Sequence, residues 1–170
     1  MSSDLVIEPI GKRHGRDNFD CGEESLNQFL KLYAGQNTRS GLGKTFVAVR
    51  PGETEVLGYY TLSSGSISFD VLPEKMPRYP IPVAHLGRLA VDRQAQRQNL
   101  GELLLIDALE RVVLAAAEIG IYAVELYALT DKAKLFYLKY GFIPLKDDTM
   151  HLYLPLETIR QSFLSEPPSR

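Results

Sequence analysis

The sequence has a single cysteine among its 170 residues, and this lone Cys21 excludes an internal disulfide. No group of cysteines and histidines has the spacing of zinc ligands, so no metal site is expected. No apolar run approaches the roughly 18 residues needed to cross a bilayer, and the N-terminus lacks the pattern of a signal peptide. These absences predict a cytoplasmic protein that does not enter the membrane.

An excess of charge of either sign is also lacking, because the formal net charge is -2 with 24% charged residues. This balance gives no reason to expect indiscriminate binding to nucleic acid. A hydrophobic content of 45% in a chain of this length supports one compact core. We therefore expect a single domain over residues 1–164 and a disordered tail over residues 165–170.

Patterns typical of hydrolases and nucleotide-binding proteins are missing too. The three histidines, His14, His85 and His151, show neither i, i+4 pairing nor an adjacent nucleophile, so each is expected to be structural. The segment "TRSGLGKT" at residues 38–45 resembles a phosphate loop, but it lacks the first glycine. It also continues into a strand-like "FVAV" instead of a helix. A flexible loop is the better interpretation.

A helix is predicted within "FDCGEESLNQFLKLYAGQN" at residues 19–37. Asp20, with Glu23 three residues later, resembles a capping box at its start. Apolar residues recur there at i, i+3, i+4, i+7 and i+8, which predicts an amphipathic helix whose buried face is formed by Leu26, Phe29, Leu30, Tyr33 and Ala34.

The remaining pattern alternates strands and helices. Two further helices are predicted over residues 101–117 and 131–141, and the second ends at Gly141. A proline-rich segment at residues 70–82 predicts a surface loop or lid without regular structure. The strand from Val83 and the strand that ends near Leu129 should form a parallel βαβ unit, giving a mixed α/β (α+β) domain. Strands rich in β-branched and aromatic residues are expected at residues 5–10, 44–49, 55–69, 82–92, 121–129 and 149–156.

The loop before the helix at residues 101–117 has the features of an anion site. Unpaired backbone N–H groups and the helix dipole favour negative charge at such a position. From Gln96 the residues are "QRQNLG", which resembles motif A of the GNAT acyltransferase superfamily, [QR]-x-x-G-x-[GA]. Asn99 replaces the first motif glycine. Because asparagine tolerates positive φ better than other non-glycine residues, the turn should be retained, although its side chain crowds a phosphate.

Two other segments extend this resemblance over nearly the whole chain. "LGRLAVD" is similar to the GNAT strand whose backbone pairs with the pantetheine arm, and "AKLFYLKYGF" at residues 133–142 resembles motif B. Together with "FDCG", these segments resemble the acetyltransferase toxins of bacterial toxin–antitoxin pairs, which acetylate the amino acid on charged tRNA. The resemblance implies a GNAT-like fold, with a mixed, mostly antiparallel central sheet flanked by helices.

The same resemblance assigns roles to individual residues. Tyr137 matches the motif B tyrosine placed beside the leaving sulfur, and a phenol with a reference pKa of about 10 is protonated at neutral pH and can act as general acid. Tyr140 and Tyr153 are neighbours that could be confused with it. The residues implied to hold acetyl-CoA are Leu89, Ala90, Val91, Gln96, Arg97, Gln98, Asn99, Leu100, Gly101 and Glu102.

The implied activity is transfer of acetyl from acetyl-CoA to the α-amino group of aminoacyl-tRNA, which blocks translation. The implied partner is a small ribbon-helix-helix antitoxin, through which any DNA contact would be indirect; a homodimer is left open. No carboxylate stands out as a general base, and an α-amine with a reference pKa of about 7.7 is already partly neutral at pH 7. Cations that could meet RNA phosphates are Arg39, Lys44, Lys75, Arg78, Arg88, Arg93, Arg97, Lys132, Lys134 and Lys139.

Two other functions stay open on the sequence. A GNAT enzyme with these motifs could instead acetylate a small-molecule or protein amine. A non-catalytic CoA-binding or protein-interaction module is the other alternative, and Asn99 in the phosphate loop is the residue that favours it.

Overall fold

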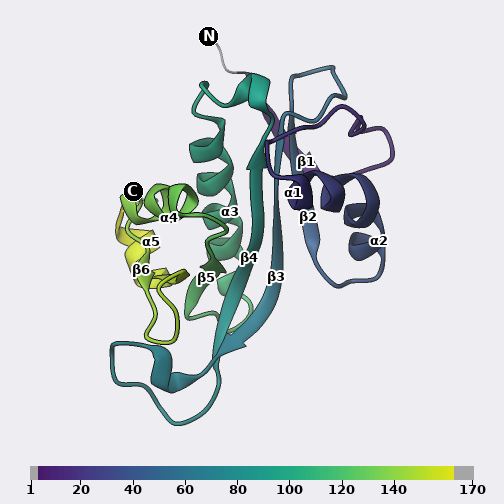
Figure 1. Cartoon of the computed structure of the whole chain (residues 1–170). Helices are drawn as coiled ribbons and strands as arrows, with labels where there is room; N and C mark the ends of the chain where they lie inside the picture. The colour runs from purple at the N-terminus through teal and green to yellow at the C-terminus, as the bar shows by residue number, and fades with distance from the viewer. Residues whose placement is uncertain (1–3, 163–170) are drawn as a thin grey trace, which may run out of the picture. The chain divides into compact units, whose positions relative to one another are not determined.

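The computed structural model describes residues 4–162 (Figure 1). Contacts between Cα atoms divide the chain into two compact units. The first unit comprises the chain up to Ser63 together with Gly87–Ala108, and the second comprises Ser64–Leu86 together with the chain from Leu109. The predicted tail at residues 165–170 lies outside the described residues.

Seven strands form one sheet in the order β1-β2-β3-β4-β5-β7-β6. The pairs β1–β2, β2–β3, β5–β7 and β6–β7 are antiparallel, whereas β4 and β5 are parallel. This confirms the predicted mixed, mostly antiparallel sheet and the parallel βαβ unit. The strands are β1 (Val6–Pro9), β2 (Lys44–Val49), β3 (Gly58–Ile67), β4 (Ile81–Val91), β5 (Ala123–Tyr127), β6 (Ile143–Pro144) and β7 (His151–Pro155).

The predicted amphipathic helix is present, but a π-helical turn interrupts it. It consists of α1 (Glu24–Gln28), the π turn η1 (Phe29–Tyr33) and α2 (Ala34–Arg39), and α2 lies beside β2 in Figure 1. The π turn contains one more residue per turn than an α-helix, so it changes which side chains face the core. Tyr33, its last residue, is 53% exposed, whereas the next residue, Ala34, is buried. The prediction that Tyr33 faces the core was therefore wrong.

The predicted capping box was also wrong. The helix begins after Glu23, and this N-cap residue makes no side-chain capping hydrogen bond. Asp20 lies further from the helix, where its carboxylate accepts from the backbone N–H of Gly22 instead, over 3.0 Å. A spacing of three residues cannot by itself show which residue is the N-cap, because helix starts vary by one or two positions.

Aromatic rings fill the core of the first unit. The ring of Tyr59 contacts Phe19 edge to face at 5.6 Å and stacks on Phe29 at 6.2 Å. Its hydroxyl donates to the carbonyl of Leu26 over 2.7 Å. The amphipathic helix is thus fixed to β3 both by apolar burial and by a hydrogen bond.

The N-terminal half of helix α3 (Leu100–Ala116) packs closely on the strands of the first unit. A Cβ atom at Gly58 would lie 2.9 Å from Leu104 Cδ1 and 3.0 Å from the carbonyl oxygen of Ala90, so only glycine permits this approach. Leu100 and Leu104 are fully enclosed. The start of α3 therefore has a fixed position relative to the end of β4.

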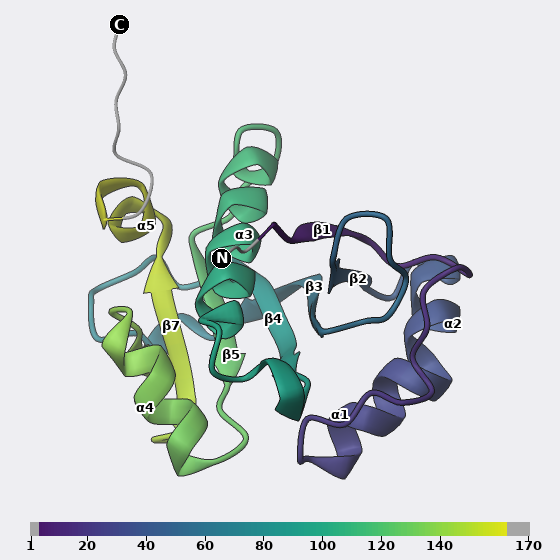
Figure 2. The same cartoon turned by 90° about the horizontal axis from the view of Figure 1, so that it is seen from above.

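In the second unit, helix α4 (Asp131–Lys139) has a defined cap at each end and lies alongside β7 in Figure 2. The Thr130 side chain accepts from Ala133 N–H over 3.1 Å at the start. Gly141, with φ of 97°, closes the predicted C-terminus: its N–H bonds to Leu138 and that of Phe142 to Tyr137. This is a Schellman motif, and the Tyr137–Phe142 ring contact at 5.4 Å accompanies it.

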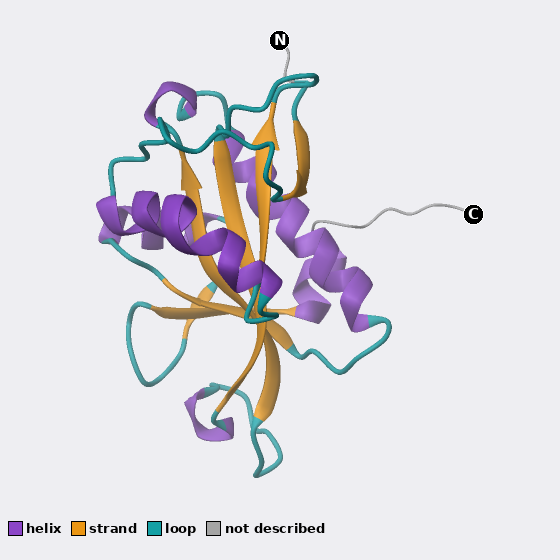
Figure 3. Ribbon diagram, turned by 90° about the vertical axis from the view of Figure 1, so that its right-hand side faces the viewer, coloured by secondary structure: helices purple, strands orange, loops and turns teal. Residues whose placement is uncertain are grey.

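Some structured segments of the second unit were not predicted. Helix α5 (Leu156–Ser162) and the short strand β6 were missed, and a 3-10 turn, η2 (Phe69–Val71), overlaps the start of the proline-rich segment. Figure 3 shows this turn and its loop at the tips of β3 and β4. The last prolines of the segment do not exclude a strand, because the Pro82 carbonyl still accepts from Tyr122 N–H over 2.8 Å. Among residues 4–162, no helix is both long and apolar enough to span a membrane.

Candidate functional site

The loop between β4 and α3 has the turn geometry that the sequence predicted. Its first residues form a 3-10 turn, η3 (Arg93–Ala95), and Asp92 caps it by accepting from Gln94 N–H over 2.9 Å. Asn99 follows with φ of 59°, and it is the only non-glycine residue with positive φ within residues 4–162. The expectation that Asn99 takes the glycine conformation is confirmed.

The start of α3 presents unpaired backbone donors. Within the described part of the chain, no hydrogen bond uses the N–H groups of Arg97, Asn99, Leu100, Gly101 and Glu102. These amides stand at the positive end of a 17-residue helix, where the helix dipole favours an anion. The preceding side chains of Arg97, Gln98 and Asn99 are exposed. This combination suits a phosphate-bearing ligand.

Gln96 contributes to the same loop in a different way. Its side-chain amide donates to the carbonyls of Cys21, over 3.1 Å, and Val91, over 2.9 Å. Both donor hydrogens are therefore engaged with the protein. The side chain of Gln96 therefore has no donor left for a phosphate, and only its backbone N–H could donate to one.

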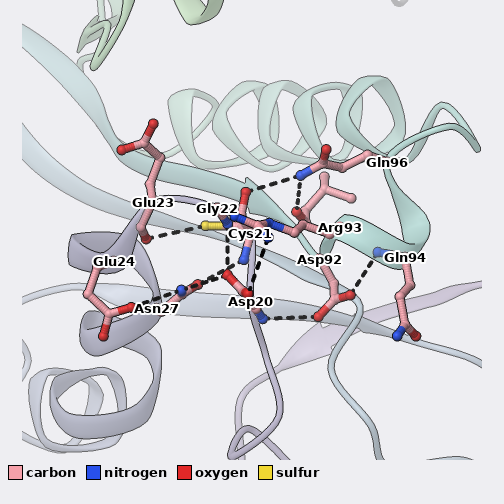
Figure 4. Close-up of polar contacts among 11 residues, drawn as sticks. Asp20, Cys21, Gly22, Glu23, Glu24, Asn27, Asp92, Arg93, Gln94 and Gln96 are labelled. Atoms are coloured by element: carbon pink, nitrogen blue, oxygen red, sulfur yellow. Dashed lines mark hydrogen bonds and ion pairs between the residues drawn. The ribbon is translucent and has the colours of Figure 1, made fainter.

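Two segments far apart in the chain meet at this loop, as Figure 4 shows. The Asp20 N–H donates to Asp92 Oδ2 over 3.0 Å, and the Arg93 N–H donates to the Asp20 carbonyl over 2.9 Å. The guanidinium of Arg93 lies 3.9 Å from the Asp20 carboxylate. These contacts could not be predicted from the sequence, since Asp20 and Asp92 are separated by 72 residues.

The residues predicted to contact the acyl arm lie at the end of β4. Strand β5 pairs with β4 only over Val83–His85, so the later residues of β4 have no partner in β5. Ala90 is buried in the aromatic core of the first unit, whereas Leu89 and Val91 are partly exposed. Ala90 can therefore offer a ligand its backbone only.

Tyr137 lies in α4, in the second unit, and its ring is enclosed. The residue is only 7% exposed, and burial raises the pKa of its phenol well above the usual value. Among the described residues its hydroxyl makes no hydrogen bond, yet Thr38 Oγ1 is the only enclosed side-chain polar atom left unpaired. The Tyr137 hydroxyl therefore has no protein partner within residues 4–162, and its raised pKa keeps it protonated as a possible donor.

The neighbouring tyrosines have different surroundings. Tyr153 donates to Glu74 over 2.7 Å, and Tyr122 donates to the same carboxylate. Burial and the Glu74 carboxylate raise the pKa of Tyr122 to about 12. The ring of Tyr140 packs against Phe136 at 5.1 Å and lies beside the Lys139 ammonium at 5.2 Å. The Tyr153 hydroxyl is thus committed to a structural contact.

A chain of acidic and imidazole groups, centred on the buried residues Glu125 and His151, was not predicted. Glu125 accepts from His85 Nδ1 over 2.7 Å and from His151 Nε2 over 2.5 Å, and His151 Nδ1 lies 2.9 Å from Asp147. The Tyr127 ring stacks on His151 at 4.0 Å. Burial alone would raise the pKa of Glu125, but its two imidazole partners outweigh burial and lower it. Sequence spacing could not reveal this chain, because it joins three strands.

His14 and residues 38–45 have defined local surroundings. His14 is buried and accepts from Gly11 N–H over 2.8 Å, as expected for a structural histidine. The segment at residues 38–45 joins the end of α2 directly to β2, which is the reverse of the strand-to-helix order of a phosphate loop. Residues 4–162 contain no group of three or more metal-ligating side chains placed to hold an ion.

Comparison with known proteins adds a consistent result. A family model for the GNAT acetyltransferase domain matches residues 20–155. A protein of Mycobacterium tuberculosis named tRNA-acetylating toxin is 40% identical over 146 residues, covering 84% of this chain and 87% of the relative.

Two solved structures share the whole fold. AtaT complexed with acetyl-methionyl-tRNAfMet matches with a TM-score of 0.87 and 35% identity, over 93% of this chain and 98% of that chain. A tyrosine-to-phenylalanine mutant of AtaT, bound to the C-terminus of the antitoxin AtaR and acetyl-CoA, matches with a TM-score of 0.84 and 34% identity. That match covers 96% of this chain and 100% of the other.

Proposed function

This chain belongs to the GNAT acetyltransferase family, and from that membership we propose that it acetylates the α-amino group of aminoacyl-tRNA. The product cannot donate its amino group in translation, so the protein would act as a toxin in the cytoplasm. The observation that carries the proposal is the 40% identity, over most of both chains, to a tRNA-acetylating toxin. We assign the activity to one GNAT domain over residues 1–164.

We assign the pyrophosphate of acetyl-CoA to the loop before α3. The unpaired N–H groups of Arg97 and of Asn99 to Glu102 supply donors, and the exposed guanidinium of Arg97 supplies charge. The main chain of Leu89–Val91 is assigned to the acyl arm. The structure of AtaT with acetyl-CoA supports this choice of donor.

Acetyl-CoA supplies the acetyl group as an activated thioester. The substrate amine forms the new C–N bond to the acetyl carbon while the C–S bond breaks, and the amine loses one proton as CoA gains one on sulfur. An α-amine with a reference pKa of about 7.7 is partly neutral at pH 7, so it needs no strong base. Tyr137 is assigned to the leaving sulfur.

The raised pKa of Tyr137 defines what this residue can do. A thiolate whose conjugate acid has a pKa of about 8.5 is a weaker base than the buried phenolate, so complete proton transfer from Tyr137 alone is unfavourable. Tyr137 would instead donate a hydrogen bond to the developing negative charge and pass its proton only as it regains the one lost by the amine.

The proposal is tested with acetyl-CoA labelled in the acetyl group and bulk charged tRNA. We expect label in the RNA fraction, released by mild alkali as an N-acetylated amino acid that mass spectrometry identifies. Deacylated tRNA is the control and should stay unlabelled. Label confined to a protein or a small amine would contradict the proposal and favour the other GNAT function.

The partner proposal rests on the complex of AtaT with the C-terminus of AtaR. We propose that a small ribbon-helix-helix antitoxin binds this chain and neutralises it, and that any contact with DNA passes through that partner. Induced expression should arrest growth, and co-expression of a ribbon-helix-helix protein from the adjacent upstream reading frame should restore growth. Arrest that persists with the partner present would contradict neutralisation.

A further inference from the structure

The Asp20–Gly22 turn is held in one conformation by a buried side chain. Asn27 is 3% exposed; its Oδ1 accepts from Cys21 N–H over 2.9 Å, and its Nδ2 donates to Asp20 Oδ1 over 3.1 Å. Gly22 adopts φ of 97°, which favours glycine. Asp20 therefore organises a turn ahead of α1 and leaves the helix N-terminus uncapped.

Other polar groups of the turn form hydrogen bonds with the loop between β4 and α3. The main chain of Asp20 makes two bonds there, donating to Asp92 and accepting from Arg93. The Cys21 carbonyl accepts from the Gln96 side chain. A Cβ atom at Gly22 would make an ordinary contact with Arg93 Nε at 3.4 Å, so the positive φ, and not lack of space, is what favours glycine here.

These contacts lie next to the donors of the proposed pyrophosphate site. They involve Asp92, Arg93 and the Gln96 side chain, whereas the unpaired N–H groups assigned to the pyrophosphate follow from Arg97. The Gln96 side chain also holds the Val91 carbonyl at the end of β4. The Gln96 side chain thus joins the turn to the last residue of β4, and Gln96 itself directly precedes the free amides.

We propose that the Asp20–Gly22 turn, braced by Asn27, is a positioning element for the phosphate-binding loop of acetyl-CoA. The inference rests on the proposed function of that loop. Neither Asp20 nor Asn27 would touch the cofactor. The turn would act through Gln96 and Arg93, fixing the loop before a ligand arrives, so that binding need not pay to order it.

A structural role alone makes a different prediction from positioning. General loosening of the fold lowers thermal stability and impairs reaction with every acetyl donor. Loss of positioning weakens the binding of those acetyl donors that carry the pyrophosphate. S-acetyl-pantetheine keeps the thioester and the pantetheine arm but lacks the pyrophosphate, so it separates the two roles.

The test uses Gln96→Met in the full chain, which removes the two side-chain donor bonds at an exposed position. Gln94→Met is the matched control: Gln94 lies in the same loop, is exposed, and within residues 4–162 its side chain makes no hydrogen bond. Asn27→Leu is a second variant that disturbs the turn from the opposite side. We measure KM and kcat with each donor, CoA affinity by calorimetry, and the melting temperature.

Loss of one or two hydrogen bonds should raise the KM for acetyl-CoA about threefold to tenfold in Gln96→Met. The KM for S-acetyl-pantetheine should rise by a clearly smaller factor, because of the two lost bonds only the one to Val91 lies in the strand assigned to the acyl arm. All parameters of Gln94→Met should stay at wild-type values. An unchanged KM for acetyl-CoA in Gln96→Met, or an equal loss with both donors, would overturn the inference alone. A wild-type protein that binds no CoA would overturn the proposed function as well.

Discussion

Tyr137 combines an enclosed ring with a hydroxyl that has no hydrogen-bond partner among the described residues, and its raised pKa keeps the proton in place. Tyr153 is also a buried tyrosine, but its hydroxyl donates a hydrogen bond to the Glu74 carboxylate. The two residues therefore differ in whether the phenol is available to a ligand. This difference distinguishes a candidate proton donor from a structural tyrosine.

Tyr137→Phe should lower kcat by about 10² or more, because the developing thiolate loses its donor, while the KM for acetyl-CoA changes little. Steady-state acetylation of charged tRNA measures both parameters. Tyr153→Phe is the control and should keep kcat while lowering the melting temperature, because it removes only the bond to Glu74. Equal activity of Tyr137→Phe and wild type would remove Tyr137 from the mechanism.

Asn99 is the residue where this chain departs from the motif, and its left-handed backbone leaves a side chain beside the proposed pyrophosphate. Asn99→Gly keeps the turn and removes the side chain, so CoA should bind as tightly as before or more tightly. Asn99→Val should cost about 1–2 kcal/mol of folding stability and weaken CoA binding, because β-branched residues resist positive φ. Calorimetry with CoA and thermal denaturation measure the pair. Weaker binding in Asn99→Gly would mean that the Asn99 side chain itself holds the ligand.

Local chemistry decides how well single residues could be predicted. The positive φ of Asn99 and the end of α4 at Gly141 depend on neighbouring backbone geometry, which the sequence reveals. The role of Asp20 depends on Asn27, Asp92 and Arg93, of which the last two lie far along the chain. A capping pattern three residues long could not separate this turn from a helix cap.

At the scale of elements, strand pairing brings together side chains that the sequence keeps apart. The parallel pair β4–β5 sets His85 opposite Glu125, and the antiparallel pair β5–β7 brings His151 to the other oxygen of the same carboxylate. The chain of imidazoles and carboxylates therefore stabilises three strands of the second unit at once. Its contribution must depend on pH.

The folded-state pKa of Glu125 is lowered, so its stabilisation is present above the unfolded pKa of about 4.3 and is lost as the pH falls through the folded value. Glu125→Gln should lower the unfolding free energy at pH 7 by about 1–3 kcal/mol and flatten the acid limb of the stability curve. Denaturant unfolding between pH 7 and 3 measures both effects. Glu110→Gln, at an exposed position of α3, is the control. The other carboxylates with lowered pKa, such as Glu8 and Glu74, are present in both wild type and Glu125→Gln, so they cannot cause a difference between them. An equally steep loss of stability in acid for both proteins would show that Glu125 does not contribute to it.

Element boundaries were predicted well where periodicity and turn residues agree. Strand β2 has the predicted bounds, and α3 starts one residue earlier than expected. Helix α5 was missed because "LPLETIR" begins with alternating apolar residues that resemble the end of a strand. The π turn was missed because its effect depends on packing against the aromatic core rather than on residue type.

For the whole molecule, the formal net charge of -2 must be reconciled with an RNA substrate. A uniform negative field would repel tRNA, so attraction has to come from local groups of lysine and arginine. Arg88 lies 3.7 Å over the ring of Phe29, Arg97 is exposed beside the free amides, and Lys132 is exposed on α4. If these three cations are the ones that meet the proposed tRNA substrate, about three phosphates are contacted.

Few contacts predict a measurable but limited salt dependence. For about three phosphates, raising the salt from about 50 to 200 mM should lower kcat/KM for charged tRNA roughly 20-fold. A small aminoacyl ester without RNA serves as the matched acceptor, because it uses the same acetyl-CoA and the same chemistry. Its kcat/KM should fall much less, and the ratio of the two acceptors isolates the RNA contacts. Parallel salt dependence for both acceptors would show that no RNA phosphate is contacted, and would move the assignment to a GNAT enzyme for small amines.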